Sequence, residues 1–244
     1  AALGERGGIR IDHILGLMRL WVVPDGASSN DGTYLAYPLH DLLNLLALES
    51  WRHRAIVIGE DLGEVPPGIR EELSRRGVMG IDVLMFTRDG AGAFLAPALW
   101  RPDAIATTTT HDLPTLSGWR QGRDIHWRRK LELIQPTRAS DDVAARTKDV
   151  ARLDAAVAHA GLGNAHDPLL GALRFTATSV SPLALLPVED ALALDEQPNL
   201  PGTVEVHPNW RRRLPDPLPH ARLRSAMQGF AEARRVAVVA ESHA

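Results

Sequence analysis

Hydrophobic and polar residues alternate along this chain in blocks that predict strands followed by helices. Six leucines between positions 38 and 54 recur at helical spacing, and the short apolar run that follows them is typical of a buried strand. The predicted elements are helices over 38–54 and 67–76, the second capped by Gly77, and strands over 55–59, 81–86 and 104–110. A regular alternation of strand and helix favours an α/β fold with a parallel sheet.

The pattern changes after position 124. Charged helices are predicted over 141–159 and 167–180, with no strand between 125 and 181. A strand over 183–188 and a terminal helix over 219–240 follow, and near the start an apolar run over 15–23 leads into a polar loop over 24–34. We therefore divide the chain into strands and helices at 1–124, a helical insertion at 125–181, and a last strand, loop and helix at 182–244.

Three hydrophobic runs end on an acidic residue. Asp12, Glu60 and Asp112 each follow such a run. Enzymes with a (β/α)8 barrel keep their chemistry at the carboxyl ends of the strands, so we expect these three carboxylates to converge on one site.

Four sequence blocks strengthen this interpretation. They are RIDH at 10–13, GEDLG at 59–63, THDLPTL at 110–116 followed by Gly118 and Trp119, and NLPGT at 199–203 followed by NWR at 209–211. In this order and spacing the chain resembles the 4-alpha-glucanotransferases, glycoside hydrolase family 77 (amylomaltase or disproportionating enzyme). The resemblance implies the C-terminal part of a (β/α)8 TIM barrel with an inserted helical segment, in which the strand before Asp12 corresponds to the family's fourth. A whole barrel has eight strand and helix units in about 250 residues, whereas only about five such units are recognisable in these 244 residues. We therefore expect the chain to be a fragment with little transferase activity alone.

The resemblance also implies roles for individual residues. Asp12 is the expected nucleophile, Glu60 the acid/base, and Asp112 a third acid that binds sugar hydroxyls. A retaining mechanism needs the first two carboxyl groups about 5 to 5.5 Å apart. Arg10 lies two positions before Asp12 and so on the same face of an extended strand, and it is expected with His13, His111 and Asn199 to bind substrate.

Other interpretations of the same residues remain open. An isolated acid after a strand is commonly a helix cap or a salt-bridge partner, and Asn199 lies in a segment rich in turn-forming residues. Trp51 and Trp127 are expected to be packing residues of helices, whereas Trp119 and Trp210 could either pack or stack on glucose.

Three other functions are also considered. The first is an α-glucan hydrolase of the same clan, and the second is an inactive fragment that only binds oligosaccharide. The third is a metal-dependent barrel hydrolase with a divalent ion bound by Asp12 and His13, Glu60, and His111 and Asp112. The His-x-His pair typical of such sites is missing from the sequence.

Net charge and cysteine content limit the kinds of partner that the chain is expected to bind. The net charge of −3 provides no broad attraction to nucleic acid or anionic membranes, and maltooligosaccharides and α-1,4-glucans, which are neutral, need none. The sequence has no cysteine, which excludes disulfides and thiolate metal sites and is compatible with a cytoplasmic location. We expect no cofactor and no metal.

Overall fold

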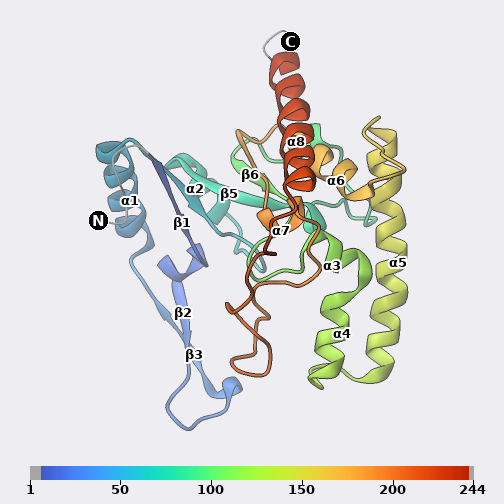
Figure 1. Cartoon of the computed structure of the whole chain (residues 1–244). Coiled ribbons are helices and arrows are strands. Elements are labelled where there is room, and N and C mark those ends of the chain that lie inside the picture. The colour runs from blue at the N-terminus through green and yellow to red at the C-terminus, as the bar shows by residue number, and fades with distance from the viewer. Residues whose placement is uncertain (1–6, 242–244) are drawn as a thin grey trace. The chain divides into compact units, whose positions relative to one another are not determined.

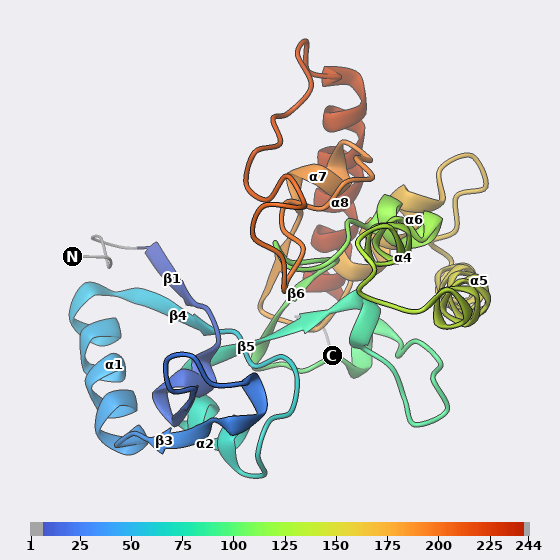
Figure 2. The same cartoon turned by 90° about the horizontal axis from the view of Figure 1, so that it is seen from below.

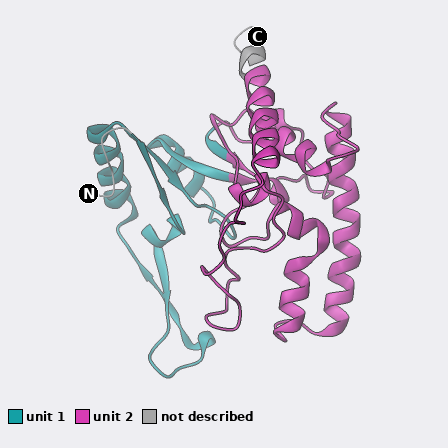
Figure 3. Cartoon of the chain, viewed as in Figure 1, with its two compact units in different colours: residues 1–81, 103–105 teal, residues 82–102, 106–244 magenta. Residues whose placement is uncertain are grey.

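The computed structural model describes residues 7–241, and the chain divides into two compact units (Figure 3). Unit 1 comprises Ala1–Ile81 and Asp103–Ile105, and unit 2 comprises Asp82–Pro102 and Ala106–Ala244. Residues 1–6 and 242–244 of the predicted ranges lie outside the described part of the chain.

Unit 1 is built on parallel strands. β1 (Gly7–Ile11) pairs in parallel with β4 (Ala55–Gly59), and β4 pairs in parallel with β5 (Val78–Val83). Figure 2 shows β1 and β4 side by side. The next strand in the sheet order is β6 (Ala104–Thr107), whose first two residues belong to unit 1.

Two helices connect the parallel strands of unit 1. α1 (Leu39–His53) is followed by its C-cap Arg54. α2 (Ile69–Arg75) is followed by its C-cap Arg76 and then by Gly77, whose φ of 70° lies in the left-handed region that glycine adopts without strain. The apolar faces of strands and helices enclose one core. Its buried members are Ile14, Leu15, Leu43, Val57, Ile69, Leu73 and Val78.

A two-stranded antiparallel hairpin follows β1. It consists of β2 (Arg19–Val22) and β3 (Thr33–Ala36), with short 3-10 helices at Ile14–Leu17 and Ser29–Asp31. The predicted loop over 24–34 therefore extends too far, because its last two residues form the start of β3. Trp21 pairs across the hairpin with Tyr34, at 5.0 Å between ring centroids, and this cross-strand contact stabilises the pairing.

Unit 2 is mainly helical. Its elements are 3-10 helices Leu84–Phe86 and Pro97–Leu99, the end of β6, α3 (Leu116–Gln121), α4 (Arg123–Lys130), α5 (Pro136–His159), α6 (Pro168–Ala177), β7 (Leu183–Leu185), α7 (Val188–Ala191) and α8 (His220–Glu241). Figure 1 shows α4 lying beside α5, and β7 neighbours β6 in the sheet order. Within unit 2, Leu84, Leu153, Leu173 and Phe175 lie at the centre of the core.

Helix ends follow local sequence signals. The Asp167 side chain accepts a hydrogen bond from the Leu170 N–H at 3.1 Å, which caps α6, and Pro168 occupies its first turn. α5 ends before Gly161, as predicted, and Gly161 has φ 71°. α5 begins at Pro136, five residues earlier than predicted.

Three predicted strands are wrong in their limits. The strand predicted over 81–86 lies at Val78–Val83, because its apolar run continues into a 3-10 helix that periodicity does not distinguish from a strand. The strand predicted over 104–110 ends at Thr107, and the strand predicted over 183–188 ends at Leu185, before Pro187 at the N-cap of α7.

The prediction that Trp51 packs in a core is also wrong. Its side chain is 78% exposed, and Leu45 and Leu48 on the same helix are 56% and 51% exposed. α1 buries Leu43 instead, because that face of the helix is the one turned toward the core of unit 1. The exposed apolar side of α1 is of a kind that marks interaction surfaces.

Among the described residues, no helix is both long enough and apolar enough to cross a bilayer.

Candidate active site

The ends of β1 and β4 bring two of the predicted acids into neighbouring positions. Ile11 pairs with Gly59 in the parallel register, so the next residues along the two strands are Asp12 and Glu60. The Glu60 N–H donates to the Ile11 carbonyl at 2.9 Å, and the Ile14 N–H donates to the Glu60 carbonyl at 3.0 Å. The main chain around both acids is therefore held by ladder hydrogen bonds on each side.

Two backbone donors hold the side chain of Glu60. The His13 N–H donates to Oε2 at 2.7 Å, and the Leu62 N–H donates to Oε1 at 3.0 Å. His13 has φ 46°, in the left-handed region that non-glycine residues rarely adopt and that is common at functional sites. The predicted substrate-binding His13 thus contacts Glu60 through its main chain.

Gly59 allows this close approach. A Cβ atom at position 59 would lie 2.8 Å from Cγ1 of Ile14, which is too close for any side chain. Glycine before Glu60 therefore lets the turn after β1 pack directly on the end of β4. The need for glycine at position 59 is therefore linked to the position of Glu60.

Arg10 forms an ion pair with Asp12, with 2.6 Å between Nη1 and Oδ1. The two side chains are 31% and 58% exposed, and both leave β1 on the same face, as the two-residue spacing predicts. The pairing places a cation next to the expected nucleophile.

Asp61, next to Glu60, is a structural acid whose importance sequence reasoning missed. Its side chain is fully buried, and it accepts hydrogen bonds from Arg70 Nε at 2.8 Å and from the Ile81 N–H at 2.9 Å. It therefore ties β4, α2 and β5 together within unit 1. The sequence did contain a signal for this role. Asp61 lies within the block at 59–63, and Arg70 follows nine residues later in a predicted helix.

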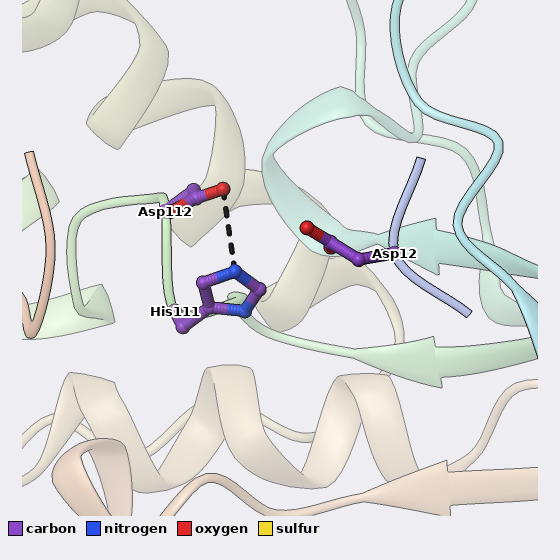
Figure 4. A group of neighbouring side chains, drawn as sticks. All are labelled: Asp12, His111 and Asp112. Atoms are coloured by element: carbon purple, nitrogen blue, oxygen red, sulfur yellow. Dashed lines mark ion pairs between the residues drawn. The ribbon is translucent and has the colours of Figure 1, made fainter. Parts of the chain in front are cut away.

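In unit 2, the third acid is held by two neighbours. His111 Nε2 lies 3.3 Å from Asp112 Oδ2, the ion pair that Figure 4 marks with a dashed line. Figure 4 also draws Asp12, which belongs to unit 1. Asn199 Nδ2 donates to Asp112 Oδ1 at 2.6 Å, and the Asn199 N–H donates to the His111 carbonyl at 3.2 Å. The structure thus brings together His111, Asp112 and Asn199.

Trp210 lies at the exposed side of this group. Its ring centroid is 5.4 Å from that of His111, and its side chain is 66% exposed. Trp119, in contrast, is 5% exposed and packs edge-on against Phe94. Trp119 is therefore a packing residue, while Trp210 has a ring face available for contact with a sugar.

The segment that presents Asn199 is braced by Asn209. The Leu200 N–H donates to Asn209 Oδ1 at 2.9 Å, and Asn209 Nδ2 donates to the Thr203 carbonyl at 2.9 Å. The two sequence blocks 199–203 and 209–211 are thus parts of one hydrogen-bonded loop. Asn199 joins this loop to the segment with the third acid, because its N–H donates to the His111 carbonyl and its side chain donates to Asp112.

Parallel strands joined by helices, with acidic residues beyond the ends of β1, β4 and β6, define the chain as part of a (β/α)8 barrel. A family model described as 4-alpha-glucanotransferase, glycoside hydrolase family 77, matches residues 2–219. The chain belongs to this family.

Relatives and solved structures agree with the match. A 4-alpha-glucanotransferase of Mycobacterium tuberculosis is 36% identical over 227 residues, covering 89% of this chain and 31% of the relative. One of Haemophilus influenzae is 32% identical over 236 residues, covering 92% of this chain and 34% of the relative. The chain therefore spans about a third of the length of these relatives.

The amylomaltase of Corynebacterium glutamicum superimposes with a TM-score of 0.82 at 31% identity, over 93% of this chain and 35% of that structure. An amylomaltase from Streptococcus agalactiae, in complex with acarbose, gives 0.69 at 21% identity, over 92% of this chain and 41% of that one, and shows the fold alone. The predicted C-terminal part of a TIM barrel is confirmed.

Proposed function

We propose that the protein containing this chain transfers an α-1,4-glucan segment from one maltooligosaccharide to the 4-hydroxyl group of another, with retention of configuration. The observation that carries the proposal is the register of β1 and β4, which places Asp12 and Glu60 on adjacent strands in a chain of the 4-alpha-glucanotransferase family. Adjacent strands lie about 4.7–4.9 Å apart, a spacing compatible with the carboxyl separation of about 5–5.5 Å in retaining enzymes.

In this mechanism, Asp12 attacks the anomeric carbon and Glu60 protonates the departing oxygen. A covalent glycosyl-enzyme forms on Asp12, and Glu60 then accepts a proton from the incoming sugar hydroxyl. The ion pair with Arg10 holds the Asp12 carboxyl group in one orientation. The backbone N–H groups of His13 and Leu62 keep the Glu60 carboxyl group in one orientation.

The His111, Asp112 and Asn199 group is proposed to bind sugar hydroxyls. A carboxylate and a carboxamide offer acceptors and donors suited to vicinal hydroxyl groups, and the neighbouring Trp210 offers an apolar ring face. Hydrogen bonds that strengthen as the ring distorts contribute to the rate of glycoside cleavage.

The proposal is tested by incubating the full-length protein with maltotriose and separating the products. Transfer yields glucose together with chains longer than maltotriose, whereas hydrolysis, the closest alternative, yields shorter sugars only. Asp12→Asn and Glu60→Gln are expected to lower turnover by several orders of magnitude. Asp25→Asn, at an exposed acid of the same unit, is the matched control and should leave turnover unchanged.

A second measurement separates the two roles. A maltosyl fluoride needs no protonation to lose its leaving group, so the Glu60→Gln variant should still form the glycosyl-enzyme and accumulate it. Mass spectrometry of its peptides is expected to find the added sugar on Asp12. A label on another residue, or transfer that stops on treatment with a chelator, would reject this mechanism, the second result in favour of a metal-dependent hydrolase.

The proposal includes a cytoplasmic location and no cofactor. It also keeps the expectation that residues 1–244 alone show little transferase activity. A misplacement of reacting groups on the order of 1 Å lowers the rate by about a hundredfold, and among the described residues β1 pairs with β4 on one side only. Turnover by the isolated chain close to that of the full-length protein would contradict this expectation.

A further inference from the structure

Asp190 is a buried acid whose purpose the proposed mechanism leaves unexplained. It lies in the short helix α7 of unit 2, and the residue is only 1% exposed. The Leu116 N–H donates to its Oδ1 at 2.6 Å, and the Thr108 hydroxyl group donates to its Oδ2. Buried carboxyl groups need such partners because their removal from water is costly.

These two donors lie at the two ends of one segment. Thr108 follows directly after β6, and Leu116 is the first residue of α3. The intervening residues 109–115 contain His111 and Asp112. One carboxyl group therefore closes the base of the loop that presents two of the proposed substrate-binding side chains.

The main chain around Asp190 reinforces this closure. Thr115 Oγ1, at the N-cap of α3, donates to the Leu194 carbonyl at 2.6 Å. A Cβ atom at Gly118 would lie 2.2 Å from the Asp195 carbonyl oxygen. The main chain of α3 is therefore in direct contact with the main chain of the segment from 190 to 199. The segment then continues to Asn199, whose side chain donates to Asp112.

We propose that Asp190 is a positioning residue that fixes the loop at 109–115 and, with it, the orientation of His111 and Asp112. Its importance for catalysis rests on the proposed function, whereas the positioning itself does not. The segment from 190 to 199 thus holds the loop at both its base and its acidic side chain.

The energetics favour a positioning role over a stabilising one. Burial raises the pKa of Asp190 to about 6, despite the opposing hydrogen bonds from Thr108 and Leu116. A buried carboxylate with such a pKa is costly to keep ionised at neutral pH, and an apolar residue of similar volume would avoid that cost. The two hydrogen bonds that Asp190 accepts define the loop geometry, which an apolar residue would not do.

The test is hydrogen exchange of the whole chain, measured peptide by peptide, and it requires no turnover. Asp190→Ala leaves a buried N–H and a buried hydroxyl group without their acceptor. We expect exchange in residues 109–116 to accelerate on the order of tenfold to a hundredfold, with exchange in α5 unchanged. Asp190→Asn keeps an acceptor for Leu116 and should restore most of the protection. Asp141→Asn, at an exposed acid on α5, is the matched control.

Nuclear magnetic resonance of the His111 ring provides a second test of the same proposal. The ring resonances of His111 should shift in Asp190→Ala and return toward their original positions in Asp190→Asn. Uniform acceleration of exchange throughout unit 2, or an unshifted His111 ring in Asp190→Ala, would overturn the proposal and leave Asp190 with a general structural role. Because neither readout depends on sugar transfer, a failure of the proposed function would appear separately, in the maltotriose assay.

Discussion

Replacing Asp190 by asparagine should change how the stability of the chain depends on pH. In the unfolded chain the pKa of this carboxyl group is near its ordinary value of 3.8, and burial, followed by the opposing bonds from Thr108 and Leu116 and the repulsion of Glu189, brings it to about 6 in the folded chain. Between these two values the folded state binds more protons than the unfolded state. The free energy of unfolding that this group contributes is therefore fully present below pH 3.8 and declines as the pH rises through 6.

The size of the effect follows from the shift. A difference of roughly two pKa units, at 1.36 kcal/mol per unit, corresponds to about 3 kcal/mol over the whole titration. About 2 kcal/mol of this is lost between pH 4 and pH 7, because the unfolded group is already partly ionised at pH 4. Asparagine has nearly the same shape and does not titrate, so Asp190→Asn lacks this loss. Relative to the original chain, the variant should gain about 2 kcal/mol of stability over the same interval.

Urea denaturation followed by far-ultraviolet circular dichroism, at several pH values from 4 to 7.5, measures this difference. Subtracting the two curves removes the contributions of titrating groups that do not interact with Asp190. The exposed-acid variant Asp141→Asn is the matched control for replacing a carboxyl group by a carboxamide. A difference for Asp190→Asn that stays level with pH would refute the reasoning, because it would mean that the carboxyl group has the same pKa in both states.

Two further predictions concern unit 2. At Glu196, burial acts to raise the pKa, but hydrogen bonds from Arg123 and Trp127 and the charge of Arg212 outweigh it and lower the pKa. Glu196→Gln should therefore reduce the free energy of unfolding at pH 7 by about 1 kcal/mol. The deficit should shrink as acid denaturation curves pass below pH 4.5, the ordinary pKa of the group, and a deficit that persists in acid would contradict the assignment. Gly118→Ala should destabilise by about 1–3 kcal/mol in urea melts, because its Cβ atom would meet the Asp195 carbonyl oxygen at 2.2 Å; an unchanged midpoint would show that α3 shifts without cost.

Local patterns in the sequence were enough to predict the strand at 55–59 and the helix that precedes it. Apolar periodicity, proline at helix starts and glycine at helix ends are signals carried by neighbouring residues, so they survive without knowledge of the tertiary fold. The four ordered blocks, likewise, identified the family that the comparisons confirm. Element limits were less accurate wherever an apolar run continued beyond its strand, as after Val83.

The tertiary structure alone decided how the acids are held. Asn199 and Asp112 are separated by 87 residues, and Thr108 and Asp190 by 82, so no local pattern links the members of either pair. The exposure of Trp51 is likewise set by which side of α1 faces the core. Sequence periodicity indicates which residues share one face of an element. Which face is buried, and which distant residues form hydrogen bonds, depends on where the folded chain places its elements.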